Sequence, residues 1–128
     1  MKEAAFHLGL ALLLTHELDA MSNHEWRVLP LVRALPEDTG MLVFVAAHVP
    51  LFAVVIALVA SSIPRTRTLS RIGVGSFLVL HGIGHALSVG HPGYEFASTL
   101  SQVLIFGGAV LGALFLLLEW RQHGAEGP

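Results

Sequence analysis

The chain has 128 residues, of which 54% are hydrophobic and only 12% are charged, and its net charge at pH 7 is −2. A soluble domain usually carries about a quarter charged residues, so this composition favours a lipid bilayer as solvent and excludes the basic surface of a nucleic-acid-binding protein. Cysteine is absent, which excludes disulfides, thiolate metal sites and cysteine nucleophiles, whereas eight histidines are unusual for so small a membrane protein.

The first predicted helix covers roughly residues 4–21 and is the least apolar of four. Residues 4–14 are apolar apart from His7, and the polar run Thr-His-Glu-Leu-Asp follows at 15–19. A spanning helix must carry this run into the far leaflet or its headgroup region. A signal peptide is the competing interpretation, because Lys2 precedes an apolar stretch of suitable length, but no small-x-small cleavage site follows. We therefore expect an uncleaved first helix.

Three further segments are long enough to cross the hydrocarbon core, which takes about 20 mostly apolar residues. Residues 41–60, 72–90 and 96–118 contain no Asp, Glu, Lys or Arg. They predict helices over roughly 40–61, 71–90 and 96–119. The expected fold class is therefore all-α, an integral membrane bundle of four transmembrane helices forming one domain over residues 1–128.

The fourth predicted helix contains a GxxxG pattern from Gly108 to Gly112. Such a pattern permits close approach of another helix, either within the bundle or in a second copy. A homodimer through the fourth helix is therefore a possible partner interaction, beside contacts with membrane lipids.

Lysine and arginine in short loops predict the orientation. With four spans, five of the seven basic residues lie on the side of both termini and the middle loop: Lys2, Arg65, Arg67, Arg71 and Arg121. Only Arg27 and Arg33 lie on the other side. The prediction is a multi-pass protein with both termini cytoplasmic and the 21–40 loop outside.

This orientation places six of the eight histidines, all but His7 and His123, toward the outer side. His81 and His85 have the i, i+4 spacing that stacks two imidazoles on one helical face. His48 lies in the outer half of the second predicted helix. Because ionisable groups at such depths are costly unless paired or placed in a cavity, these side chains are expected to meet inside the bundle.

The meeting side chains predict a metal site of imidazoles and carboxylates. The candidate ligands are His16, Glu17, His48, His81 and His85. Asp19 and Glu17 are the candidate catalytic groups, as general base or as partner of a ligand. The residues expected to contact the ligands rather than the metal are His24, Glu25, Ser88 and Gln102. A ligand set without thiolate suits zinc first, with non-haem iron or copper as alternatives. Haem is less favoured, because the carboxylates would then have no role.

The residues resemble a family of small bacterial membrane proteins known only as a domain of unknown function and predicted to have four helices. The resemblance rests on Thr-His-Glu-Leu-Asp-Ala at 15–20, Glu25-Trp26, His-Val-Pro-Leu at 48–51, and the pair His81 and His85. It covers nearly the whole chain. It implies the fold, a bacterial inner membrane and the choice of site residues, but no reaction.

A looser resemblance links the site to membrane metal hydrolases that include the alkaline ceramidases and relatives of the adiponectin receptors. These hold zinc with three histidines, a carboxylate and a serine. The corresponding residues would be His48, His81, His85, Asp19 or Glu17, and Ser88. Those proteins have seven helices, so the resemblance concerns the site alone.

The expected function is metal-dependent chemistry, hydrolysis ahead of oxidation, on a lipid-like or small apolar substrate that enters from the outer leaflet. A transport or metal-handling protein for metal ions, other ions or protons would use the same cluster as a transient site. A structural or partner-binding subunit would use it only to hold helices together.

Overall fold

The computed structural model describes residues 1–125, and their side chains as far as Gln122, so His123 lies outside the described side chains. This range contains four α-helices and no strand. The helices are α1 (Lys2–Ser22), α2 (Glu37–Val59), α3 (Pro64–Ser88) and α4 (Thr99–Ala125), and two short 3₁₀ helices follow α1, η1 (Glu25–Arg27) and η2 (Val32–Ala34). The prediction of an all-helical, four-helix chain is confirmed.

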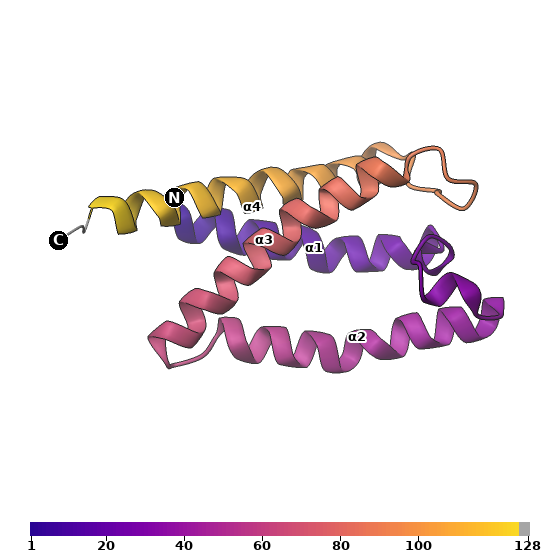
Figure 1. Cartoon of the computed structure of the whole chain (residues 1–128), viewed down its shortest axis with the longest axis horizontal. Helices are drawn as coiled ribbons and strands as arrows, with labels where there is room; N and C mark the ends of the chain where they lie inside the picture. The colour runs from indigo at the N-terminus through magenta and orange to yellow at the C-terminus, as the bar shows by residue number, and fades with distance from the viewer. Residues whose placement is uncertain (126–128) are drawn as a thin grey trace.

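The helices run up and down along the long axis of the molecule (Figure 1). The N-terminus, the α2–α3 turn and the end of α4 lie at one end, and the η1–η2 segment and the α3–α4 loop lie at the other. α4 packs along both α1 and α3, whereas α2 contacts mainly α3, η1 and η2. The molecule is thus a tight three-helix group with α2 set beside it.

Small residues let α3 and α4 approach closely. A Cβ atom on Gly112 would lie 2.7 Å from the carbonyl oxygen of Gly75 and 2.8 Å from Cβ of Leu78. Gly108 lies against Leu78 and against Leu12 of α1. The Gly108–Gly112 pattern is therefore used for packing inside the chain, so this face is not left free for a second copy.

The helix bounds differ from the predicted ones where polar residues intervene. α3 begins at Pro64 rather than near residue 71, because proline suits the first turn of a helix. α4 begins at Thr99 rather than near 96, because Ser98 Oγ accepts a hydrogen bond from Ser101 N at 3.0 Å and caps the helix. Residues 92–98 form a non-helical strap that carries Phe96, whose side chain is fully buried.

Among the described helices, two are long and apolar enough to cross a membrane: α2 over Glu37–Val59 and α4 over Thr99–Gln122. α1 contains His16, Glu17 and Asp19, and α3 begins with arginines and contains several glycines and two histidines, which lowers the hydropathy of both. Four spanning helices are therefore not confirmed by length and composition.

Candidate metal centre

Four side chains converge between α1, η1 and α3. One ligand atom from each of His16, Glu25, His81 and His85 can be chosen so that all four lie within 4.8 Å of one another. Imidazole nitrogen and carboxylate oxygen bind zinc and similar ions at about 2.0–2.2 Å. Small side-chain movements would therefore let these four residues share one ion, and we call them the four-ligand group.

The three imidazoles form a compact triangle. Ring centroids are 4.9 Å apart for His16 and His81, 5.0 Å for His16 and His85, and 4.5 Å for His81 and His85. The i, i+4 spacing on α3 accounts for the last pair, as the sequence predicts. His16 and His85 are buried, and His81 is half-buried.

Several polar atoms of this group are buried without a hydrogen-bond partner. They are both ring nitrogens of His16, Nε2 of His81 and Oε2 of Glu25. The contacts between them are ion-pair contacts without hydrogen-bond geometry: His16 Nε2 lies 3.4 Å from Glu25 Oε2, and His85 Nε2 lies 3.7 Å from Glu25 Oε1. Leaving a buried polar atom unpaired costs about 1–3 kcal/mol, and a bound ion or water at this point could satisfy the whole cluster.

Glu25 carries a negative charge in this environment. Burial by itself would raise the pKa of Glu25, but the neighbouring imidazoles of His16 and His85 outweigh it and lower the pKa to about 2. The carboxylate is therefore ionised at neutral pH, which is the form that binds a metal ion.

A second layer of contacts fixes His85 and His16. The hydroxyl of Tyr94 lies 3.4 Å from Nδ1 of His85, which leaves Nε2 of His85 facing Glu25. The ring of Phe96 packs against both imidazoles, with centroid distances of 4.8 Å to His85 and 5.4 Å to His16. Gln102 donates a hydrogen bond of 2.6 Å from Nε2 to the carbonyl oxygen of Phe96. Gln102 was predicted to contact a ligand; in the structure it instead holds the backbone of Phe96, whose ring packs on two of the imidazoles.

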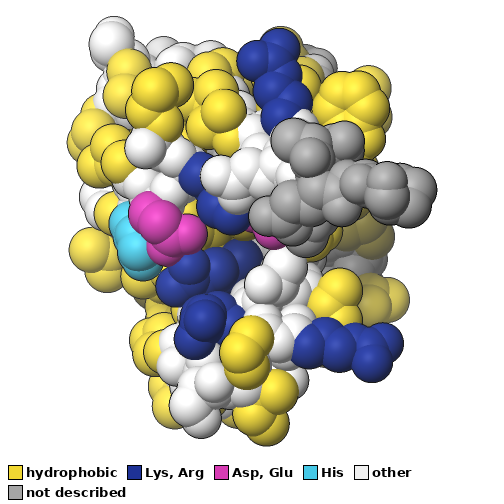
Figure 2. All heavy atoms as spheres, turned by 90° about the vertical axis from the view of Figure 1, so that its left-hand side faces the viewer, with side chains coloured by type: hydrophobic (Ala, Val, Ile, Leu, Met, Phe, Trp, Pro, Cys, Tyr) yellow, Lys and Arg dark blue, Asp and Glu magenta, His cyan; other side chains and the backbone are white. Residues whose placement is uncertain are grey.

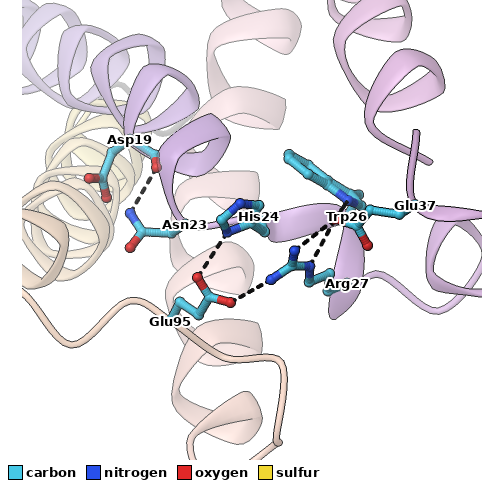
Figure 3. Close-up of polar contacts among 7 residues, drawn as sticks. All are labelled: Asp19, Asn23, His24, Trp26, Arg27, Glu37 and Glu95. Atoms are coloured by element: carbon cyan, nitrogen blue, oxygen red, sulfur yellow. Dashed lines mark hydrogen bonds and ion pairs between the residues drawn. The ribbon is translucent and has the colours of Figure 1, made fainter. Parts of the chain in front are cut away.

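Polar contacts join the turn that contains Glu25 to the start of α2 and to residues 92–98 (Figure 3). Arg27 binds Glu37 at the start of α2 and Glu95 in the 92–98 strap, with distances of 2.9 and 2.8 Å. Nδ1 of His24 lies 2.9 Å from Glu95, and Trp26 donates a hydrogen bond to Glu37 at 3.0 Å. We call these five residues, His24, Trp26, Arg27, Glu37 and Glu95, the loop clasp. His24 and Trp26 flank Glu25 in the sequence, and the clasp joins this turn to the start of α2 and to residues 92–98.

Glu17 and His48, both predicted as ligands, pair with each other instead of joining the four-ligand group. Oε2 of Glu17 lies 2.9 Å from Nε2 of His48. Nδ1 of His48 lies 2.7 Å from the carbonyl oxygen of Phe44, and since a carbonyl only accepts, this nitrogen donates. The pair therefore forms a separate link between α1 and α2 beside the four-ligand group.

Two other predicted residues also lie outside that group. Asp19 has one buried carboxylate oxygen, Oδ2, without a hydrogen-bond partner, and its carbonyl oxygen accepts from Asn23. The hydroxyl of Ser88 donates to the carbonyl oxygen of Gly84, on its own helix.

The sequence predicted Glu25 as a neighbour of the ligands rather than as a ligand, and it gave no role to Tyr94. The Glu25-Trp26 pair was visible in the sequence, but nothing there gave the path of the loop that turns Glu25 inward. Tyr94 carries no spacing signal that could have found it.

A cavity of about 580 Å³ adjoins the four-ligand group and lies between α1, α2 and α3. Glu25 and His81 of the four-ligand group line it, and so do Glu17 and His48. Nearly all other lining side chains are apolar. His16 and His85 lie behind this wall, so a molecule in the cavity would approach the centre from the side of Glu25 and His81.

Comparison with known proteins gives one finding. A family model matches residues 2–122, and its description is a family of unknown function (DUF6713). Neither the curated proteins nor the solved structures give a match.

Proposed function

We propose that this chain, which belongs to the family of unknown function DUF6713, is an integral membrane metalloenzyme, with hydrolysis ahead of oxidation, acting on a lipid-like or small apolar substrate. The observation that carries the proposal is the four-ligand group, with its buried and unpaired imidazole and carboxylate atoms. A structural polar network would satisfy these atoms with hydrogen bonds, as native interiors do.

The donor set favours particular metals. Three imidazoles and one carboxylate suit zinc and non-haem iron, with copper(II) as a third choice. Zinc would supply Lewis acidity and a water of lowered pKa, which is hydrolytic chemistry. Iron or copper would supply oxidation instead, so the identity of the metal decides between the two reactions.

The chain's own residues divide the remaining work. His16, His81 and His85 would hold the ion, and Glu25 would complete its coordination on the side of the cavity. Glu17 and His48 line the same cavity and are the groups placed to move a proton to or from a substrate held there.

Membrane insertion is supported by the surface of α2. Only 11% of its most apolar 18-residue stretch is buried inside the chain, although the mean hydropathy of that stretch is 2.7. Large side chains such as Leu42, Val49 and Val54 are exposed. Water would solvate such a surface poorly, whereas lipid would cover it. We propose that all four helices cross the bilayer and that the polar groups of α1 and α3 face the bundle.

The charge distribution supports the proposed orientation in a bacterial inner membrane. Lysine and arginine side chains gather at the end formed by the start of α1, the α2–α3 turn and the end of α4 (Figure 2). This end would face the cytoplasm with both termini, and the metal centre would lie toward the opposite side.

The testing experiment is elemental analysis of the detergent-purified protein beside a His81→Ala/His85→Ala variant and a His7→Ala control. His7 is an exposed histidine of α1 outside the site, so its removal leaves the donors intact. We expect about one transition-metal ion per chain in the native protein and in the control, and loss of the ion from a double variant that keeps its helical circular dichroism.

The alternatives give different results. If the native protein holds no metal after incubation with zinc, iron and copper, the metalloenzyme proposal is wrong. If the ion leaves under mild chelation, the cluster is a transient site of a metal-handling protein.

A further inference from the structure

The apolar cavity beside the metal centre is elongated. On α2 its lining runs from Val43 to Val59, and at a rise of 1.5 Å per residue this stretch is about 24 Å long. The hydrocarbon core of a bilayer is about 30 Å thick. The cavity therefore follows a helix over most of the depth that a lipid chain would occupy.

The polar groups of the cavity gather at one end. Glu17, Glu25, His48 and His81 lie toward the loop end of the bundle, whereas lining residues toward the termini are apolar apart from Ser70. The occupant should therefore have one small polar head and one long apolar tail.

The charges at the polar end restrict the head. Two carboxylates, those of Glu17 and Glu25, line the cavity, and no lysine or arginine is among its described lining residues. A phosphate head is normally held by such cations. A small uncharged head with an oxygen atom could instead hydrogen-bond to His48 or Glu17.

From this lining we infer that the cavity binds a single-chain amphiphile with a small uncharged oxygen-bearing head, such as a long-chain alcohol, aldehyde or ester. The tail lies between α1, α2 and α3, and the head lies at Glu25 and His81. This inference names the substrate class of the proposed enzyme and rests on that function for the chemistry at the head.

Two glycines of α3 provide a matched pair of variants. Gly73 lines the cavity, and a Cβ atom there would meet no atom within 4 Å. Gly84 has the same open surroundings but does not line the cavity. Gly73→Leu should therefore block the cavity without straining the fold, while Gly84→Leu adds the same side chain elsewhere on the helix.

The probe is a hexadecanol carrying a photoactivatable diazirine midway along its chain, added to the metal-loaded protein in nanodiscs. We expect cross-links on the lining segments of α1, α2 and α3, and a loss of more than tenfold in Gly73→Leu, because a blocked cavity forfeits the burial of many methylenes. Gly84→Leu should label like the native protein. The same chain ending in phosphate should label the cavity weakly.

Equal labelling of the two glycine variants, or cross-links only on the outward face of α2, would overturn the inference. Equal labelling by the phosphate probe would overturn the assignment of an uncharged head. Should Gly73→Leu fail to fold, Ala47→Phe on the α2 wall of the cavity tests the same block.

Metal content measured in the same samples separates this inference from the proposed function. A metal-loaded protein whose cavity takes no probe would keep the metalloenzyme proposal and refute the substrate class. A metal-free protein whose labelling still depends on Gly73 would refute the enzyme and keep the lipid site.

Discussion

Glu25 differs from the other three members of the four-ligand group in how it is held. The histidines lie on long helices, whereas Glu25 lies on the three-residue helix η1 directly after His24, which has a left-handed backbone with φ of 51°. Such a conformation is uncommon for a residue other than glycine and persists where surrounding contacts impose it. The loop clasp supplies those contacts, so the position of Glu25 depends on residues that do not touch the metal centre.

Removal of Arg27 tests this dependence. Arg27→Ala should weaken metal binding by up to about tenfold, the lower end of the effect of losing a ligand's direct partner, because Arg27 holds the loop and does not contact Glu25 itself. It should leave the melting temperature nearly unchanged, because the lost ion pairs are exposed to solvent and contribute little to stability. Competition with a chelator measures the first effect and thermal melting the second.

The matched control is Arg33→Ala, an exposed arginine of η2 outside the clasp. Metal affinity that is equal in the two variants would show that the clasp does not position Glu25.

At the scale of the elements, the sequence predicts where a residue lies along its helix better than which way its side chain points. Hydropathy located four helices, and the i, i+4 spacing correctly placed His81 and His85 on one face. His48 lines the same cavity as Glu25 and His81, but its position along the helix does not say which way its side chain points. In the structure His48 faces Glu17, and its place as a candidate ligand is taken by Glu25 from a loop. Loop paths depend on long-range contacts such as Arg27–Glu95, which no local pattern encodes.

Contact between α3 and α4 should be sensitive to a single methyl group. Gly112→Ala would place a Cβ atom against the backbone of Gly75, which cannot move as a flexible side chain can. We expect a loss of about 1–3 kcal/mol in the free energy of unfolding, the usual cost of overpacking. Thermal melting in detergent measures it.

Gly84→Ala is the control for this substitution, since its Cβ atom would meet nothing within 4 Å. Alanine also favours the helix more than glycine does, so the melting temperature of Gly84→Ala should stay the same or rise. An unchanged melting temperature for Gly112→Ala would contradict the close packing of the two helices.

At the scale of the whole molecule, the two ends of the bundle differ in charge and in chemistry. One end carries five of the seven basic residues, and the other carries the four-ligand group and the loop clasp. If the chain spans a bacterial inner membrane as proposed, the positively charged end remains in the cytoplasm. Substrate and metal would then reach the site from the periplasmic half.

The absence of cysteine makes this orientation simple to test. A single cysteine at Pro92, in the exposed α3–α4 loop, should react with a membrane-impermeant maleimide in intact spheroplasts. A cysteine at Ser62, in the α2–α3 turn, should react only after the membrane is opened. The reverse pattern would invert the proposed topology, and reaction of both in intact spheroplasts would contradict four spans.

Two of the four candidate ligands lie in the first half of the chain and two in the second, which determines when during synthesis a metal ion could be bound. A nascent chain that ends before α3 has only His16 and Glu25 of the group, and two donors hold a transition metal poorly. All four ligands exist together only once α3 has been made and has packed against α1. Metal loading would therefore come late, so the ion would be acquired by the assembled bundle and could not guide its early folding. If the chain is the metalloenzyme proposed above, cells short of metal would make folded but inactive protein that a later supply of the ion could activate.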